Sequence, residues 1–170
     1  MSDITSGRAR TDDNLQGGVR EIYFFNYLND AFTVAANVAT AMNSGLTVAY
    51  KYVIQGDGNT LTENNVSDKK IGTKLNTQTL VAQLKQINSA SNVQLDLMLE
   101  GQNSAVILDW NGQYRWIAEN GFNVTATADA VTGGARNEFN GYNVTLVSQT
   151  LRLAPILDSS TVTAFIAIVT

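Results

Sequence analysis

Two carboxylates in the middle of the chain, Asp109 and Glu119, could act together as a general acid and a general base. Such a pair hydrolyses glycosidic bonds when the two groups flank the substrate. Other catalytic chemistry is restricted, because the chain has no histidine and no cysteine. Ser-His-Asp triads, Cys-His dyads and zinc sites built on imidazole or thiolate are therefore excluded. Because any chain with 15 acidic residues offers such pairs, a small carboxylate-dependent hydrolase is an alternative interpretation and not the first one.

Three further motifs could bind ligands, and each has a simpler structural interpretation. Trp110, Tyr114 and Trp116 could stack on sugars or bases, but cross-strand packing of a hairpin explains them more simply. Gly56-Asp-Gly58 and Gly133-Gly134 lack the lysine and the helix start of a phosphate-binding loop. Asp57 and Asn59 lack the remaining ligands of a calcium loop. We therefore expect turns at these places, and no cofactor or metal.

The charges are unevenly distributed along the chain. The net charge is −4. Between residues 96 and 138, six acids and two arginines also sum to −4, so the rest of the chain is balanced. An acidic surface does not bind the phosphate backbone of nucleic acids. The same charge is also typical of an ordinary solvated face. Lys69, Lys70 and Lys74 form the one basic cluster, which is too small for a nucleic-acid footprint and suits an intersubunit or solvent contact.

The strongest structural signal is the Asn111-Gly112 pair between two runs of β-forming residues, 104–110 and 114–118. Asn-Gly is the best short-range marker of a two-residue type I′ hairpin, since both loop residues need positive φ. This hairpin fixes β structure in the centre of the chain, and the flanking segments are then interpreted in register with it.

Most of the remaining chain also has the alternating pattern of strands. In the strand expected at Val19–Tyr27, apolar side chains lie on both faces, which indicates burial against two partners. Residues 46–55 and 60–64 are expected to form a hairpin around the turn at 56–59. Other strands are expected at 72–86, 122–129, 142–147 and 161–169.

Two segments depart from this alternation. Residues 91–101 predict one short helix, with Ser91 and Asn92 as capping residues and Gly101 at the C-terminal end. Asp30–Gly45 is compatible either with a short helix or with an extended loop. The fold class expected is therefore mainly β, an antiparallel barrel or sandwich with one short α-helix.

The domain organisation expected is a flexible N-terminal arm at residues 1–18 and a single β-rich domain at 19–170. The domain carries a loop insertion near residues 30–46. The N-terminus shows no apolar signal-peptide core, so synthesis in the cytoplasm is expected. The apolar runs are too short for a transmembrane span.

The central and C-terminal segments resemble a known family. The hairpin at 105–121 (AVILDWNGQYRWIAENG) leads through a Gly-rich loop to the strand in 133–146 (GGARNEFNGYNVTL). This order is similar to the C-terminal half of the tail tube proteins of tailed phages. Gly17–Phe25 resembles their first strand, and the helix near 91–101 matches the fold they share with type VI secretion tubes. Residues 30–46 have no counterpart in that pattern.

The resemblance implies a virion structural protein that assembles into hexameric rings stacked as a hollow tail tube, through which the genome DNA passes without specific binding. It also implies contacts with other phage tail proteins and a location in the virion tail. Subunit contacts are then expected in the arm and in the insertion, and acids are expected at the lumen. The interface candidates are Ile4, Arg8, Arg10, Leu15, Phe32, Val34, Val38 and Met42, and the lumen candidates are Asp109, Glu119 and Asp129.

Two other functions remain open from the sequence. A different virion part, such as a capsid decoration or head-tail joining protein, would use the same kind of β fold. The hydrolase alternative requires a concave pocket in which two carboxylates converge. The tube predicts rings or long polymers, whereas a decoration protein predicts monomers or trimers.

Overall fold

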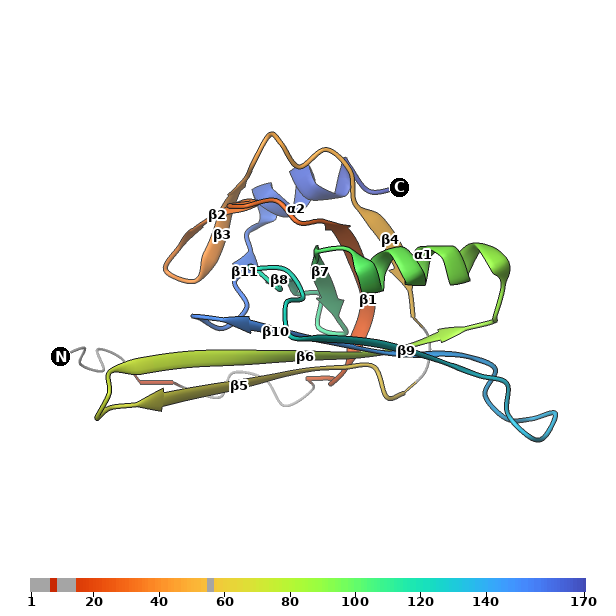
Figure 1. Ribbon diagram of the computed structural model, residues 1–170. Coiled ribbons are helices and arrows are strands. Elements are labelled where there is room, and N and C mark those ends of the chain that lie inside the picture. The colour runs from red at the N-terminus through yellow and green to blue at the C-terminus, as the bar shows by residue number, and fades with distance from the viewer. Residues whose placement is uncertain (1–6, 9–14, 55–56) are drawn as a thin grey trace.

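The computed structural model describes residues 7–8, 15–54 and 57–170, which form two β-sheets and two α-helices (Figure 1). The larger sheet has seven strands in the spatial order β2 (Phe32–Ala35), β3 (Val38–Met42), β11 (Ile156–Leu157), β8 (Tyr114–Ile117), β7 (Asn103–Asp109), β1 (Val19–Asn26) and β4 (Tyr50–Val53). The smaller sheet has four strands, in the order β5 (Thr60–Asp68), β6 (Thr73–Lys85), β10 (Gly141–Thr150) and β9 (Thr125–Val131). The helices are α1 (Ser89–Glu100) and α2 (Ser159–Ile166).

The elements pack in layers, with the seven-stranded sheet between α2 and the four-stranded sheet (Figure 1). Strand β1 contributes to both interfaces, because successive side chains of a strand point to opposite faces. Ile22 and Phe24 lie in the core between the two sheets, together with Leu80 and Leu146 of the smaller sheet. Tyr23 and Phe25 lie in a second core that α2 covers. The prediction that this strand is buried on two sides is therefore confirmed.

The fold class is the predicted one, a mainly β protein with a sandwich-like arrangement of sheets. The strand pairs are antiparallel, except that β11 runs parallel to β3. The prediction of one helix is wrong, because residues 159–166 form a helix and not the strand expected at 161–169. Asp158 begins α2 by accepting the Thr161 N–H at 2.7 Å, and Phe165 is fully buried. The run of apolar residues therefore reflects burial of one helix face.

The helix expected at 91–101 is confirmed as α1. It begins two residues earlier, where the Asn88 side chain accepts the Ser91 N–H at 2.7 Å. Gly101 ends it, as predicted. Asn88 is therefore the N-cap, and not Ser91 or Asn92.

The insertion at Asp30–Gly45 is neither a helix nor a loop but the hairpin of β2 and β3. Ala36 and Asn37 connect the strands with φ of 49° and 62°, which is the two-residue type I′ turn. The sequence hides this turn, since alanine rarely adopts positive φ.

The Asn111-Gly112 hairpin forms, but not with the predicted turn. Asp109 pairs with Gln113, and the Gly112 N–H donates to the Asp109 carbonyl at 3.2 Å. Gly112 has a φ of 79°, whereas Asn111 is not among the residues of positive φ. The loop is thus a three-residue connection with a left-handed glycine in its last position.

The prediction of a hairpin between residues 46–55 and 60–64 is wrong. Strand β4 pairs with β1 in the larger sheet, while β5 pairs with β6 in the smaller one. The chain therefore passes from the larger sheet to the smaller one between β4 and β5. The turn expected at 56–59 lies partly outside the described residues.

Candidate assembly surface

The face of the four-stranded sheet that points away from the core carries mainly hydroxyl, amide and small apolar side chains. Alternation along each strand directs Leu80, Val144 and Leu146 inward. The cross-strand register places the intervening residues on the opposite face. These residues, here called the outer face, are Thr60, Thr62, Asn64, Thr77, Thr79, Val81, Gln83, Thr125, Thr127, Asp129, Asn143, Thr145, Val147 and Gln149.

The outer face carries little charge. Asp129 is ionised at neutral pH, and by the same register Lys85 and Asp68 extend this face at its two ends. Hydroxyl and amide groups hydrogen-bond to water without fixing a counterion, so such a face does not hold a polyanion by charge. Figure 1 shows no helix or strand over this side of the sheet.

The two edges of this sheet, β5 and β9, have no strand partner on their outer sides in the described part of the chain. Strand β5 has nine residues and β9 has seven, and neither contains lysine or proline. The charged residues on these edges are Glu63 and Asp68 of β5 and Asp129 of β9. Long edge strands are templates for pairing with another chain, and monomeric proteins usually protect them. The edges are therefore candidates for subunit contacts.

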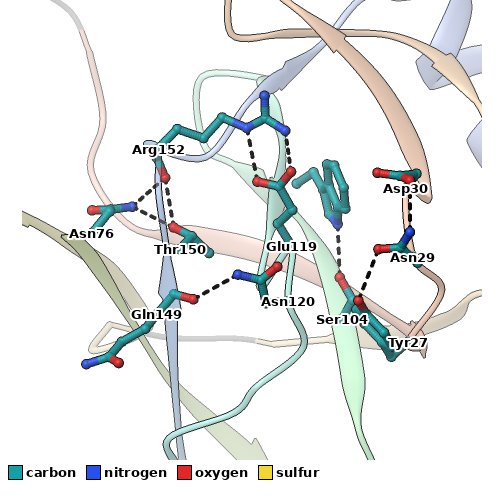
Figure 2. Close-up of polar contacts among 11 residues, drawn as sticks. Tyr27, Asn29, Asp30, Asn76, Ser104, Glu119, Asn120, Gln149, Thr150 and Arg152 are labelled. Atoms are coloured by element: carbon teal, nitrogen blue, oxygen red, sulfur yellow. Dashed lines mark hydrogen bonds and ion pairs between the residues drawn. The ribbon is translucent and has the colours of Figure 1, made fainter. Parts of the chain in front are cut away.

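A buried polar cluster holds β5 and β6 in place against the connector after β10. The Glu63 Oε1 atom accepts hydrogen bonds from Gln78 Nε2 at 2.9 Å and from the Ala154 N–H at 2.7 Å. Asn76, which is fully buried, donates to the same oxygen and to the Arg152 carbonyl (2.7 Å; Figure 2). Three donors therefore depend on one carboxylate oxygen.

Replacing Glu63 by alanine is expected to destabilise the fold by about 2 kcal/mol, because Gln78 Nε2 and the Ala154 N–H then lose their acceptor, whereas Asn76 keeps the Arg152 carbonyl. E63Q keeps an acceptor oxygen and should cost less. Urea unfolding of the two variants measures the difference. Equal stability of E63A and the wild type would show that the cluster contributes nothing.

Of the two predicted acid–base residues, Asp109 organises the hairpin turn. Its Oδ1 atom accepts the N–H groups of Asn111 at 2.8 Å and Gln113 at 2.9 Å. Asn111 in turn exchanges two hydrogen bonds with the backbone of Gln16, which ties the end of the predicted arm to the turn. Asp109 thus has a structural role, and it is half-buried at the end of β7.

Glu119 lies beyond the opposite end of β8, where it forms a bidentate ion pair with Arg152 (Figure 2). The four residues of β8, about 13 Å of extended chain, separate it from the hairpin turn. A glycosidase pair lies within about 9.5 Å. The structure therefore does not bring Asp109 and Glu119 together, and of the three predicted lumen acids only Asp129 lies on the outer face.

The aromatic cluster predicted around the hairpin does not assemble into a binding surface. Trp116 is 1% exposed, its ring contacts Phe32, and its indole N–H donates to Ser104 at 2.9 Å. Trp110 lies half-exposed at the turn, with the Arg20 guanidinium 6.0 Å from its ring. The two tryptophans thus have separate surroundings.

The predicted interface residues fall into three groups. Phe32 is buried against Trp116 and Phe165, so it is a core residue and not an exposed contact. Val34 and Met42 pack partly against the same core, and Val38 is half-buried. In the arm, Arg8 and Leu15 are exposed, whereas Ile4 and Arg10 lie outside the described residues.

Glu21 is a buried carboxylate, 8% exposed, at the edge of the second core. It binds the Lys51 ammonium at 3.1 Å and accepts the Tyr23 hydroxyl. Burial alone would raise the pKa of Glu21, but the hydrogen bonds from Tyr23 and Lys51 and the charges of Lys51 and Arg20 outweigh burial and lower it. Burial and the bond to Glu21 raise the pKa of Tyr23 far above 10.

The fold is expected to lose stability in acid partly through Glu21. Because the folded-state pKa of Glu21 lies below 4.5, its stabilisation is present above that pH and is lost as pH falls through the folded value. Urea midpoints between pH 7 and pH 3 should fall for the wild type and fall less steeply for E21Q. An identical slope in both proteins would contradict this assignment.

The sequence reasoning missed the outer face and its edges. The signal was present in the alternating threonines of β5, β6 and β9, but their shared face depends on a strand order that runs 5-6-10-9. In the described residues, no three acidic side chains gather as metal ligands, and no helix is long and apolar enough to cross a membrane. Comparison with the known protein families, the curated proteins and the solved structures finds no match.

Proposed function

We propose that this chain is the structural subunit of a phage tail tube, in which copies join side by side through β5 and β9. The observation that carries the proposal is the four-stranded sheet, which in the described part of the chain combines two long edges without a strand partner and an outer face of low charge. The sequence resemblance to tail tube proteins points to the same kind of assembly.

The strand directions suit such a ring. All pairs in this sheet are antiparallel and the number of strands is even. Strand β9 of one copy therefore runs opposite to β5 of the next, and the antiparallel alternation continues through any number of copies. Closing the ring leaves no open edge, which is how closed sheets avoid further aggregation.

In this arrangement the outer face lines the lumen. Threonine, asparagine and glutamine side chains would present a hydrated, nearly neutral wall to passing DNA, which gains no counterion-release energy from it. This replaces the acidic lumen expected from the sequence, since Glu119 is paired with Arg152 and Asp109 caps a turn. The role is assembly and passage, without turnover.

Negative-stain electron microscopy of the purified protein at high concentration tests the proposal. Rings with a central hole, or tubes built from them, are the expected result. A monodisperse monomer or trimer at every concentration would overturn it and would favour a capsid decoration or head-tail joining role.

A further inference from the structure

The hairpin of β5 and β6 projects beyond the body of the molecule. Pairing of β6 with β10 ends at Asn76, whereas pairing with β5 continues through three more residue pairs to Asp68 and Thr73. Those pairs extend the hairpin by about 10 Å. In Figure 1 it reaches past the other elements at one end of the sheet.

The end of this hairpin, here called the tip (residues 66–75), is basic and partly apolar, and hydrogen bonds to Asp68 form its turn. Asp68 Oδ1 accepts the Lys70 N–H at 2.8 Å and the Ile71 N–H at 3.3 Å, and Gly72 closes the turn with a φ of 72°. Ile71 is 73% exposed at the apex. Lys69, Lys70 and Lys74 are exposed and take part in no ion pair within the described residues.

A groove of complementary character lies at the other end of the molecule, between α1 and the edge strand β9. It has a volume of about 300 Å³, and Leu95, Leu99, Ala128 and Ala130 provide apolar walls. Asp96 also lines it. Glu100 follows one helical turn later on the same side of α1, and α1 contains no basic residue to neutralise the two acids.

The tip lies at one end of the four-stranded sheet, and α1 and β9, which line the groove, lie toward the other end (Figure 1). A copy therefore cannot place its own tip in its own groove, while a second copy aligned end to end can. A contact between two different surfaces of the same chain propagates as a chain of copies or stacks rings. Opposite charge on the two surfaces fixes their pairing and opposes tip-to-tip contacts.

We propose that the tip of one copy docks in the α1–β9 groove of a second copy, with Ile71 against the apolar walls and Lys69 and Lys70 facing Asp96 and Glu100. Where the proposed tube function holds, this contact stacks one ring on the next, and it deepens that function without depending on the lateral edges. The lateral contact uses strand pairing, whereas the end-to-end contact uses charge and is weakened by salt.

A charge swap tests the contact. K69E/K70E makes the tip acidic while the groove stays acidic, and D96K/E100K makes both surfaces basic. All four positions are exposed, so the variants are expected to keep the wild-type urea midpoint. End-to-end association, measured by light scattering at low ionic strength and by electron microscopy, should weaken at least about tenfold in each variant alone.

An equimolar mixture of the two variants should regain association, because the basic tip of D96K/E100K then meets the acidic groove of K69E/K70E. The quadruple variant should also regain it. If K69E/K70E and D96K/E100K each form rings that do not stack, and the mixture of the two forms stacked rings, the result supports both this contact and the tube. Rings that stack regardless of charge overturn the contact and leave the tube. Charge-dependent chains without any rings support the contact and overturn the tube.

Discussion

Lysine substitutions on the two edge strands of the four-stranded sheet are expected to abolish ring assembly and to leave the fold intact. The variant T60K/T62K/T125K/T127K places two lysines on β5 and two on β9, at exposed positions of the outer face. Across a β9–β5 contact between copies, like charges then oppose each other, at up to ~1 kcal/mol for each directly opposed pair. Ring closure multiplies this cost over every interface.

The matched control places the same charge on the same face but on the central strands. T77K/T79K/N143K/T145K adds four lysines to β6 and β10, and none of them opposes another in the register of the sheet. It should still form rings by electron microscopy. If the edge variant also forms rings at wild-type concentrations, the open edges are not the subunit contact.

Replacing Trp116 by alanine is expected to be the most destabilising single change in the described core, at about 3–5 kcal/mol. Trp116 is the largest of the fully buried side chains, and its ring lies 5.2 Å from that of Phe32. Its loss leaves a cavity in the second core, beside Phe32 and the other residues packed there, and it removes the indole donor to Ser104. Thermal and urea unfolding measure the effect, with a fall in Tm of about 10 °C.

Trp110→Ala is the control for this prediction. Trp110 is 47% exposed at the hairpin turn, so its truncation should cost about 1 kcal/mol or less. The chain has only these two tryptophans, so each variant retains a single tryptophan whose fluorescence can be assigned. Equal destabilisation by the two changes would show that the second core does not depend on Trp116.

Local patterns were enough to predict the parts of the fold whose partners are close in sequence. The apolar residues on both faces of β1 correctly indicated two buried faces, because alternate side chains of this strand pack into the two cores. Gly101 and the apolar residues before it marked α1, although its N-cap is Asn88 and not Ser91 or Asn92. The Asn111-Gly112 pair marked a hairpin, although Asp109 turns the chain in three residues and not in two.

The remaining elements depend on contacts that no local pattern contains. Ala36 and Asn37 adopt positive φ because Phe32 and Ala39 are held in the core on either side of the turn. Residues 161–169 have the composition of a strand, yet packing of Phe165 against Tyr23 and Phe25 favours a helix. Tertiary burial outweighs intrinsic propensity in both places.

The candidate surface could be predicted only in part. The lysine cluster at 69–74 was assigned from its composition to an intersubunit or solvent contact, and the intersubunit contact stays a prediction. The outer face was not, since strands distant in sequence, such as β6 and β10, bring its threonines together. The lumen acids were predicted from their charge alone. In the structure Glu119 forms an ion pair with Arg152, and Asp109 accepts hydrogen bonds within the hairpin turn.

Cysteine cross-linking between β5 and β9 tests the central claim most directly, because the natural chain has no cysteine and therefore no background. Within one copy these strands are separated by β6 and β10, about 14 Å in all, which is too far for a disulfide. Thr127→Cys is combined with Thr60→Cys, Thr62→Cys or Asn64→Cys to sample the register. The account predicts that at least one pair oxidises to a ladder of covalent multimers that ends at the closed ring. Monomer alone in all three variants, under conditions where the wild type assembles, would contradict it.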